Sequence, residues 1–514
     1  MNALKLSFIG KALLVTLVAL MLSAGSAFAQ NNQPDATALA TDALVSINAM
    51  WVIVAAIFIF LMQAGFALVE TGFTRAKNVA NTMSMVLMVF AVSALCYWAV
   101  GFAFQFGGIN RLMPDLGAGE WIYSPTSLGD WGSSLQNELS FGNYGLLGLN
   151  GFMLSGIGAN FGILAFFFFQ FCFAAACVAI PTGAVAERMK WGGYLVMTIL
   201  VSALIYPLIG NWGWGGGWLA NLGRSMNLGN GLVDFAGSGV IHMTGGAVAL
   251  AGALVIGPRI GKYNRDGSAN TIAGHNVPMG VLGTFILVIG WFAFNSGSAL
   301  GFTGASRDLA IVAVVNTLLA VSAAGVSAML YMMFASPNRR PDPVMTVNGL
   351  LAGAVSITGP CAFVDPWAAV VIGLAAGLLV CWSAALLEKL KIDDPVGAVP
   401  VHLVCGAWGL LAVGIFANGN PQTAYWNGVS GAVTGALNGG IPQLIAQLIS
   451  LIAITVVAFG LAYIVFKVMQ GAGLLRVSAD VELAGMDVAE MGVEGYPPDF
   501  EPSIESLRDM AAVR

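Results

Sequence analysis

Long apolar segments recur along almost the whole chain, separated by shorter stretches richer in glycine, proline and polar residues. A transmembrane helix needs about 20 mostly apolar residues, and eleven segments meet this requirement. We expect them at roughly 48–72, 79–106, 160–186, 191–211, 236–257, 277–297, 308–335, 345–364, 366–386, 396–416 and 441–468. The pattern therefore predicts an all-α polytopic membrane protein with eleven transmembrane helices.

The N-terminal segment has a different pattern from these spans. Lys5 and Lys11 precede the short apolar stretch Ala12–Leu22, and Ala27-Phe28-Ala29 follows. A basic start, a short apolar centre and an A-x-A end are typical of a cleavable signal peptide. An additional membrane helix is the alternative, but the apolar centre is short and the residues after Gln30 are polar. We therefore predict a signal peptide over residues 1–29.

Composition and charge place the chain in a bilayer and orient it. It is 58% hydrophobic and 9% charged, which is unlike a soluble domain, and it shows no nucleic-acid-binding pattern. Loops facing the cytoplasm carry an excess of Lys and Arg. With the mature N-terminus in the periplasm, twelve basic residues of the loops and helix ends fall inside and three fall outside. We expect a multi-pass inner-membrane protein with its C-terminus in the cytoplasm.

Two larger segments lie outside the predicted spans. Residues 107–159 form an outer loop rich in Gly, Asn and Ser. The membrane domain spans residues 30–470, and residues 471–514 form an acidic cytoplasmic tail that could be flexible or could dock. The expected organisation is thus a signal peptide, one membrane domain and a tail.

Two histidines lie inside apolar segments at matching places in a repeated pattern. The pattern is Asp234-x7-His242-x3-Gly246 in one segment and Asp394-x7-His402-x3-Gly406 in the other. The segments are five spans apart, and five is odd, so the second copy must be inverted, as in many transporters. Eight helical residues place each histidine about 12 Å into the membrane, from opposite sides. The chain therefore predicts a 5+5 inverted repeat, about 48–258 and 277–416, plus an eleventh helix at 441–468.

These residues are similar to the motifs of the ammonium transporters, the Amt/Mep/Rh family. The similarity includes the segment from Asp234 to His242 and continues through Ala186-Glu187-Arg188, Trp214-Gly-Gly-Gly217, Gly290–Ser298 and Asp393-Asp394-Pro395 to His402. It covers about residues 45–480 in family order. The resemblance implies an ammonium transporter of the bacterial Amt branch, which is not an enzyme and needs no cofactor or metal.

The resemblance also implies roles for particular residues. His242 and His402 correspond to the pair of histidines that lines the family's pore. Trp214, Phe173, Ser298 and Asp234 correspond to the outer substrate site, where ring faces attract ammonium, Ser298 accepts a hydrogen bond and Asp234 supports the site without coordinating the cation. Phe173 and Phe294, with Phe169 one turn earlier, correspond to a hydrophobic gate. Judged without the family, each phenylalanine is better explained by packing, and Asp234 by a helix N-cap.

The expected mechanism is recruitment of ammonium outside, deprotonation at the gate and passage of neutral ammonia, because a bare cation is costly in hydrocarbon. The resemblance further implies a homotrimer in membrane lipid and a tail that contacts PII signalling proteins. An ammonium sensor acting through such a partner is one alternative. An Rh-like ammonia or gas channel is another, although Trp214 and Ser298 argue against it. No histidine–carboxylate cluster has the spacing of metal ligands.

Three ionisable residues outside the predicted site lie near the predicted inner face. Glu70 stands where familiar members of the family have an aromatic residue, and it could pair with Arg75 or Lys77 by extending toward the membrane surface. We favour a structural role for Glu70 over a place in the proton path. Asp394 is expected to cap or organise the inner loop. His275 is expected to have no role in the pore.

Overall fold

The structure is a computed structural model that describes residues 36–109, 128–129, 134–142, 144–423 and 431–497. The chain divides into two compact units, residues 1–46 and 47–514. In the first unit, residues 36–46 form the beginning of helix α2 (Ala36–Phe73). The predicted signal peptide, residues 1–29, lies outside the described residues. All other described elements belong to the second unit.

Ten helical segments of the described chain are long and apolar enough to cross a membrane. They are Ala36–Phe73, Ala76–Phe106, Phe161–Val185, Trp191–Gly213, Ser238–Ile256, Val277–Gly297, Gly304–Phe334, Pro366–Lys389, Val399–Phe416 and Ile441–Gly471. Helix α12 (Pro343–Thr358) lies where a further span was predicted at 345–364, but it has 16 residues, fewer than a spanning helix usually has. The pattern of eleven apolar segments thus corresponds to ten long helices and one short one.

Four of these segments contain a π-helical turn, a feature often found at functional sites. Tyr97–Gly101 joins α3 (Val79–Cys96) to α4 (Phe102–Phe106), and Val201–Ile205 joins α6 (Trp191–Leu200) to α7 (Tyr206–Gly213). The other two turns, Ser238–Met243 and Val399–Val404, begin the segments that continue as α9 (Thr244–Ile256) and α14 (Cys405–Phe416). Both of these contain a histidine of the repeated pattern.

The remaining long helices are uninterrupted, and two of them, α5 (Phe161–Val185) and α10 (Val277–Gly297), begin at a side-chain cap. The others are α11 (Gly304–Phe334), α13 (Pro366–Lys389) and α15 (Ile441–Gly471). Asn160 accepts from the Ile163 N–H, and Asn276 accepts from the Met279 N–H. Such caps satisfy N–H groups that have no partner within the helix.

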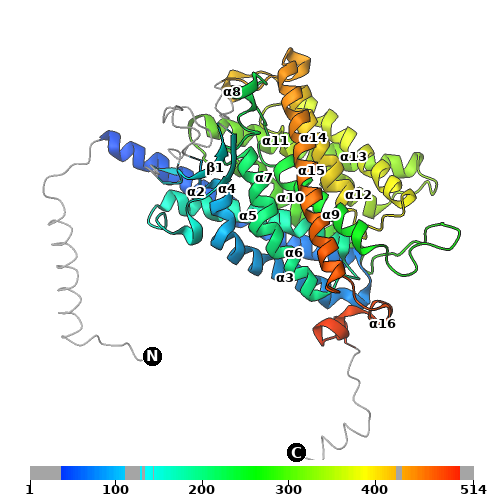
Figure 1. The fold of residues 1–514 in the computed structure, drawn as a ribbon. Coiled ribbons are helices and arrows are strands. Elements are labelled where there is room, and N and C mark those ends of the chain that lie inside the picture. Colours follow the sequence, from blue (N-terminus) through cyan, green and yellow to red (C-terminus); the bar gives the residue numbers. More distant parts are fainter. Residues whose placement is uncertain (1–35, 110–127, 130–133, 143, 424–430, 498–514) are drawn as a thin grey trace, which may run out of the picture. The chain divides into compact units, whose positions relative to one another are not determined.

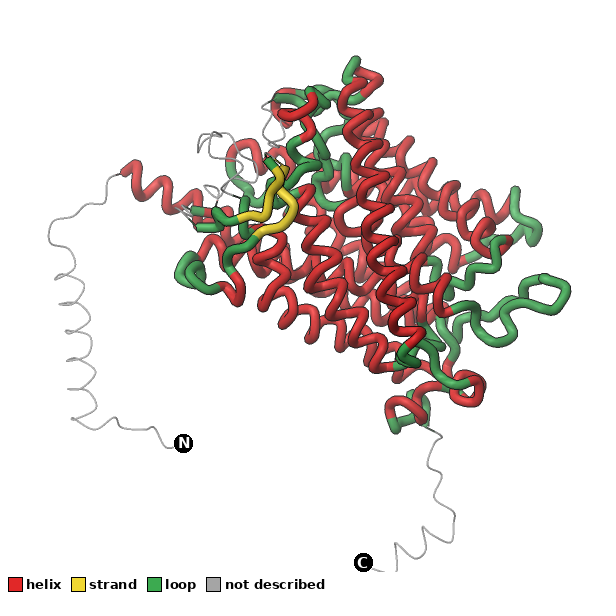
Figure 2. The backbone as a smooth tube through the Cα atoms, viewed as in Figure 1, coloured by secondary structure: helices red, strands yellow, loops and turns green. Residues whose placement is uncertain are grey.

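Helix α15 shows how side chains are distributed for a lipid environment. Its exposed positions include the large apolar residues Ile452, Val456 and Ile464, whereas its buried positions include Gln447 and Ala458. This arrangement is the reverse of a soluble amphipathic helix, because lipid accepts apolar side chains and small residues allow helices to approach closely. Figure 2 shows the long helices of this unit running side by side.

The loop predicted at 107–159 contains, among its described residues, a two-stranded antiparallel hairpin that the pattern of the sequence did not predict. Strand β1 (Glu138–Phe141) pairs with β2 (Tyr144–Gly148). The hairpin packs on α4 and α7, and Trp212 of α7 donates a hydrogen bond to the Leu146 carbonyl. In Figure 1 the hairpin and α16 (Ala479–Ala484) lie near opposite ends of the helices.

A buried network of charges joins the segments at the end of the helices where basic residues concentrate. The Glu187 carboxylate accepts from the backbone N–H and guanidinium of Arg75 and from Arg259. Arg259 also pairs with Asp393, at 2.9 Å. Burial alone would raise the pKa of Asp393, but the hydrogen bond and charge of Arg259, together with the charge of Arg188, lower it to about 2.

The first part of the acidic tail docks on this same end. Lys77 donates to the carbonyls of Glu482 and Leu483, and the Asp487 carboxylate accepts from the Ala80 and Asn81 N–H groups at the start of α3. Of the two possibilities for the tail, docking therefore holds for the described residues up to 497.

Candidate functional site

The two histidines of the repeated pattern meet inside the second unit. The Nδ1 atoms of His242 and His402 lie 3.2 Å apart, and the two rings are nearly parallel. Both side chains are buried. Since a neutral imidazole has one N–H and one acceptor nitrogen, one Nδ1 must carry the shared hydrogen and the other must accept it. The pair therefore consists of two different tautomers.

An aspartate and a glycine build each histidine turn in the same way. The Asp234 carboxylate accepts from the N–H groups of Gly237, Gly239 and Val240. The Asp394 carboxylate accepts from Gly397 and Val399. Gly237 and Gly397 both have positive φ, which a glycine adopts without strain. Each aspartate thus accepts hydrogen bonds from N–H groups at the start of its histidine turn, although the N-cap positions themselves are Gly237 and Ala398.

Burial affects the charge of Asp234. Removal from water raises its pKa to about 6, while the hydrogen bonds from the backbone N–H groups lower it.

The glycine four residues after each histidine allows the two turns to approach. A Cβ atom added at Gly246 would lie 2.3 Å from the Leu403 nitrogen, and one added at Gly406 would lie 2.5 Å from the Ser238 carbonyl oxygen. The turn that holds each histidine also packs against the helix that follows the other histidine. The spacing His-x3-Gly thus has a steric reason, because each glycine makes room for the opposite turn.

A continuous series of aromatic contacts leads to the histidine pair. Phe169 contacts Phe173 at 4.6 Å between ring centroids, and Phe173 stacks on Phe294 at 4.2 Å. Phe294 contacts His242 at 5.6 Å, and Trp214 contacts Phe173 at 5.9 Å. The structure therefore brings together six of the predicted site residues: Phe169, Phe173, Trp214, Phe294, His242 and His402.

Asp234 and Ser298 join this group through the backbone. The Trp214 indole N–H donates to the Asp234 carbonyl at 2.9 Å, and the Ser298 hydroxyl donates to the Phe294 carbonyl at 2.8 Å. Because the Ser298 proton is used in this bond, its oxygen is oriented to accept one. Among the described side-chain contacts, Ser298 is not joined directly to Trp214 or Phe173.

Several residues that position the site were missed at the level of sequence. Trp291 stacks on His242 at 5.0 Å and donates to Thr358. The sequence could have indicated Trp291, because it precedes Phe294 by one helical turn and therefore lies on the same face of the helix. Gln443 and Gln447 of α15 bond the backbone of residues 230–233, which lead into Asp234. No local pattern links α15 to that segment.

The structure corrects the expected partners of Glu70. The Glu70 carboxylate contacts the Thr182 hydroxyl, whereas Arg75 binds Glu187 and Lys77 binds the tail. Glu70 lies in the buried last part of α2, whereas Arg75 and Lys77 follow the end of that helix. His275 contacts Thr74 and Tyr496, away from the histidine pair, in agreement with the expectation.

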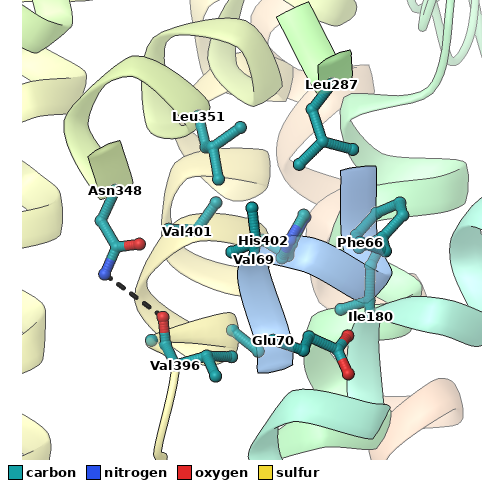
Figure 3. Close-up of a pocket in the computed structure, with 12 residues that line it drawn as sticks. Phe66, Val69, Glu70, Ile180, Leu287, Asn348, Leu351, Val396, Val401 and His402 are labelled. Atoms are coloured by element: carbon teal, nitrogen blue, oxygen red, sulfur yellow. Dashed lines mark hydrogen bonds between the residues drawn. The ribbon is translucent and has the colours of Figure 1, made fainter. Parts of the chain in front are cut away.

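A small cavity of about 30 Å³ lies beside His402 of the pair. His402 and Glu70 both line it, and most of its other lining residues are apolar (Figure 3). A water molecule needs about 10–15 Å³ by this measure, so the cavity has room for one or two molecules of that size.

Comparison with known proteins identifies the family. A family model described as the Ammonium Transporter Family matches residues 50–496. The chain belongs to this family. It is 40% identical over 492 residues to ammonium transporter Amt2 of Archaeoglobus fulgidus, covering 95% of this chain and 96% of the relative. It is 34% identical to a putative ammonium transporter of Synechocystis, covering 90% and 91%.

Solved structures of family members have the same fold. A protein described as a Sensor Amt Protein superposes with a TM-score of 0.73 at 35% identity, covering 88% of this chain and 99% of that one. Candida albicans Mep2 superposes with a TM-score of 0.70 at 26% identity, covering 89% and 92%. This chain is therefore a multi-pass membrane protein of the ammonium transporter family, as the resemblance implied.

Proposed function

We propose that the protein transports ammonium, recruiting the cation at the periplasmic side, removing a proton and conducting ammonia past His242 and His402 into the cytoplasm. The single observation that supports this most is the buried histidine pair at the end of the aromatic series. A buried imidazole pair can accept from and donate to a small polar molecule, while apolar walls disfavour a cation.

The aromatic residues support a cation site before this apolar path. The faces of Trp214 and Phe173 attract ammonium, and the Ser298 oxygen accepts a hydrogen bond that potassium cannot donate. The ionised Asp234 strengthens the local field and fixes the turn of His242 without touching the cation. Phe173 and Phe294, packed against Phe169, form the proposed gate. This combination favours ammonium over a metal cation of similar size.

The architecture that goes with this function is a 5+5 inverted repeat in a homotrimer, with a cleaved signal peptide and a cytoplasmic tail. The matching construction of the two histidine turns supports the repeat. The concentration of basic residues and the docked tail at one end of the helices support that end as cytoplasmic.

Sensing is a second candidate, because one similar structure is described as a sensor and because the tail is bonded to loops at the ends of the spans. In this alternative, ammonium occupancy alters the docked tail and is passed to a PII-type protein. Purified protein without any partner distinguishes the two, since a transporter produces flux on its own and a sensor without transport does not.

The test is uptake by proteoliposomes under ammonium and potassium gradients. A desolvated cation–π contact contributes about 2 kcal/mol, so Trp214→Leu should weaken apparent ammonium affinity about thirtyfold. Trp98→Leu is the matched control, because Trp98 is 40% exposed and lies outside the aromatic series. Potassium flux equal to ammonium flux through the wild-type protein would contradict the proposal.

A further inference from the structure

The cavity beside His402 is lined by an acid, Glu70, that has no role in the transport pathway proposed above. Glu70 is 3% exposed, and its carboxyl group is one of three polar side chains in the lining, with Asn348 and His402. The Asn348 amide is turned to the Val396 carbonyl, at 3.3 Å (Figure 3). Glu70 and His402 are therefore the two groups of the lining that can exchange protons.

One oxygen of Glu70 lacks a hydrogen-bond partner among the described residues. Its Oε1 contacts the Thr182 hydroxyl, but its buried Oε2 has none. Leaving a buried polar atom unpaired costs free energy, and the cavity beside it is large enough for a small molecule. A molecule with N–H or O–H groups in the cavity would remove this cost.

The contact with Thr182 suits both protonation states of the carboxyl group. The Thr182 hydroxyl has one proton and two neighbouring acceptors, Glu70 Oε1 and the Ala179 carbonyl at 2.5 Å. If Thr182 donates to Glu70, the carboxylate is stabilised. If Thr182 donates to Ala179, it can accept a hydrogen from a protonated Glu70. Rotation of one hydroxyl thus accommodates gain or loss of a proton by Glu70.

The charged groups near Glu70 do not pair with its carboxylate, so a mobile cation can do so. Two other titratable groups interact electrostatically with Glu70: the charge of Asp394 acts on Glu70, and the charge of Glu70 acts on Tyr194. Neither group is a cation. The nearest basic residues in the sequence, Arg75 and Lys77 just after the end of α2, are engaged by Glu187 and the tail. Among the described residues, the carboxylate has no ion-pair partner.

We propose that Glu70 and this cavity form an inner site where ammonia leaving the histidine pair becomes ammonium; this rests on the transport function proposed above. The nitrogen lone pair of ammonia takes the carboxyl proton, so that an O–H bond breaks and an N–H bond forms. The resulting carboxylate binds the ammonium ion until the ion moves into the cytoplasm. A cytoplasmic water molecule then gives a proton to the carboxylate and is left as hydroxide, so that one ammonia and one water yield one ammonium and one hydroxide. The proposal thus takes up the alternative to a structural role for Glu70, a place in the proton path.

The decisive variant is Glu70→Gln, which keeps the size of the side chain but can neither exchange a proton nor carry charge. General acid catalysis contributes about a hundredfold or more, and since water can partly replace it, we expect the maximal ammonium flux to fall about tenfold or more. The outer apparent KM should stay within about twofold, because the outer site is untouched. Glu70→Asp, which retains the acid, should recover most of the flux.

Thr71→Val is the matched control, because Thr71 is a buried neighbour on α2 that does not line the cavity; its flux should equal that of the wild type. A folded Glu70→Gln protein with wild-type flux would overturn the proposal. Absence of ammonium flux in the wild type would instead overturn the transport function. Should Glu70→Gln fail to fold, Glu70→Ala takes its place: removal of the acid should lower maximal flux by a similar factor at unchanged KM, and wild-type values for both would overturn the proposal.

Discussion

The close approach at Gly406 leads to a prediction about the histidine pair. In Gly406→Ala the new Cβ would lie 2.5 Å from the Ser238 carbonyl oxygen and 3.1 Å from the Met243 nitrogen. Ordinary contact begins at 3.4 Å, so the turn Ser238–Met243 must move by about 0.9 Å. Backbone atoms lack the freedom of a flexible side chain, and overpacking of this kind costs about 1–3 kcal/mol.

His242 belongs to the turn that must move. Its Nδ1 atom is 3.2 Å from that of His402, and a shift of 0.9 Å passed on in full would lengthen this to about 4.1 Å, beyond hydrogen-bond distance. If the pair conducts ammonia, the substitution should lower ammonium flux strongly while the protein remains folded.

The assay is ammonium uptake by proteoliposomes, with thermal unfolding of the same preparations in detergent. Gly460→Ala is the matched control, since Gly460 also lies within a long helix but an added Cβ there meets nothing within 4 Å. We expect the control to keep wild-type flux and stability. Wild-type flux in a folded Gly406→Ala protein would refute the argument that the glycine sets the distance between the histidines.

Two further predictions concern the charge network at the basic end. Glu187→Gln leaves the guanidinium groups of Arg75 and Arg259 without their shared carboxylate, and should lower the free energy of unfolding by about 3–5 kcal/mol. The control is Glu388→Gln, at an exposed pair with Lys262, which should lower it by at most about 1 kcal/mol. Equal losses in the two variants would contradict the role of burial. Because the pKa of Asp393 is lowered to about 2, its roughly 2 kcal/mol of stabilisation should be complete above about pH 5 and lost as pH falls toward 2. Unfolding measured against pH should show this loss in the wild type but not in Asp393→Asn.

The pattern of the chain predicted most helices to within a few residues, because a membrane span must be long and apolar and its ends are marked by polar or capping residues. The segment at 277–297 agrees with α10 at both ends. The prediction differs more at α2, which begins at Ala36 rather than near 48, and at α12, which ends at Thr358 rather than near 364. The residues after it remain apolar but turn toward Asp234, so composition alone does not mark the helix end.

The candidate site was predicted where spacing along the chain carries the information. The repeated Asp-x7-His-x3-Gly pattern identified both histidines and their aspartates, since those contacts lie within a single turn. The partner of Glu70 could not be predicted in this way. Arg75 and Lys77 are near it in sequence, but the rotation of α2 and the packing of α5 place Thr182 beside its carboxyl group.

The sequence by itself determined that this chain spans a membrane many times, that two histidines lie deep in apolar segments, and which aromatic residues accompany them. The spans and the depth of the histidines follow from local composition and spacing, whereas the aromatic residues were indicated by the resemblance to the ammonium transporters. Only the tertiary structure decided that the two Nδ1 atoms share a hydrogen bond, that Trp291 stacks on His242, and that Glu70 faces a cavity with His402. Each of these contacts joins segments far apart in the chain, and their distances are set by how closely glycine allows the helices to pack.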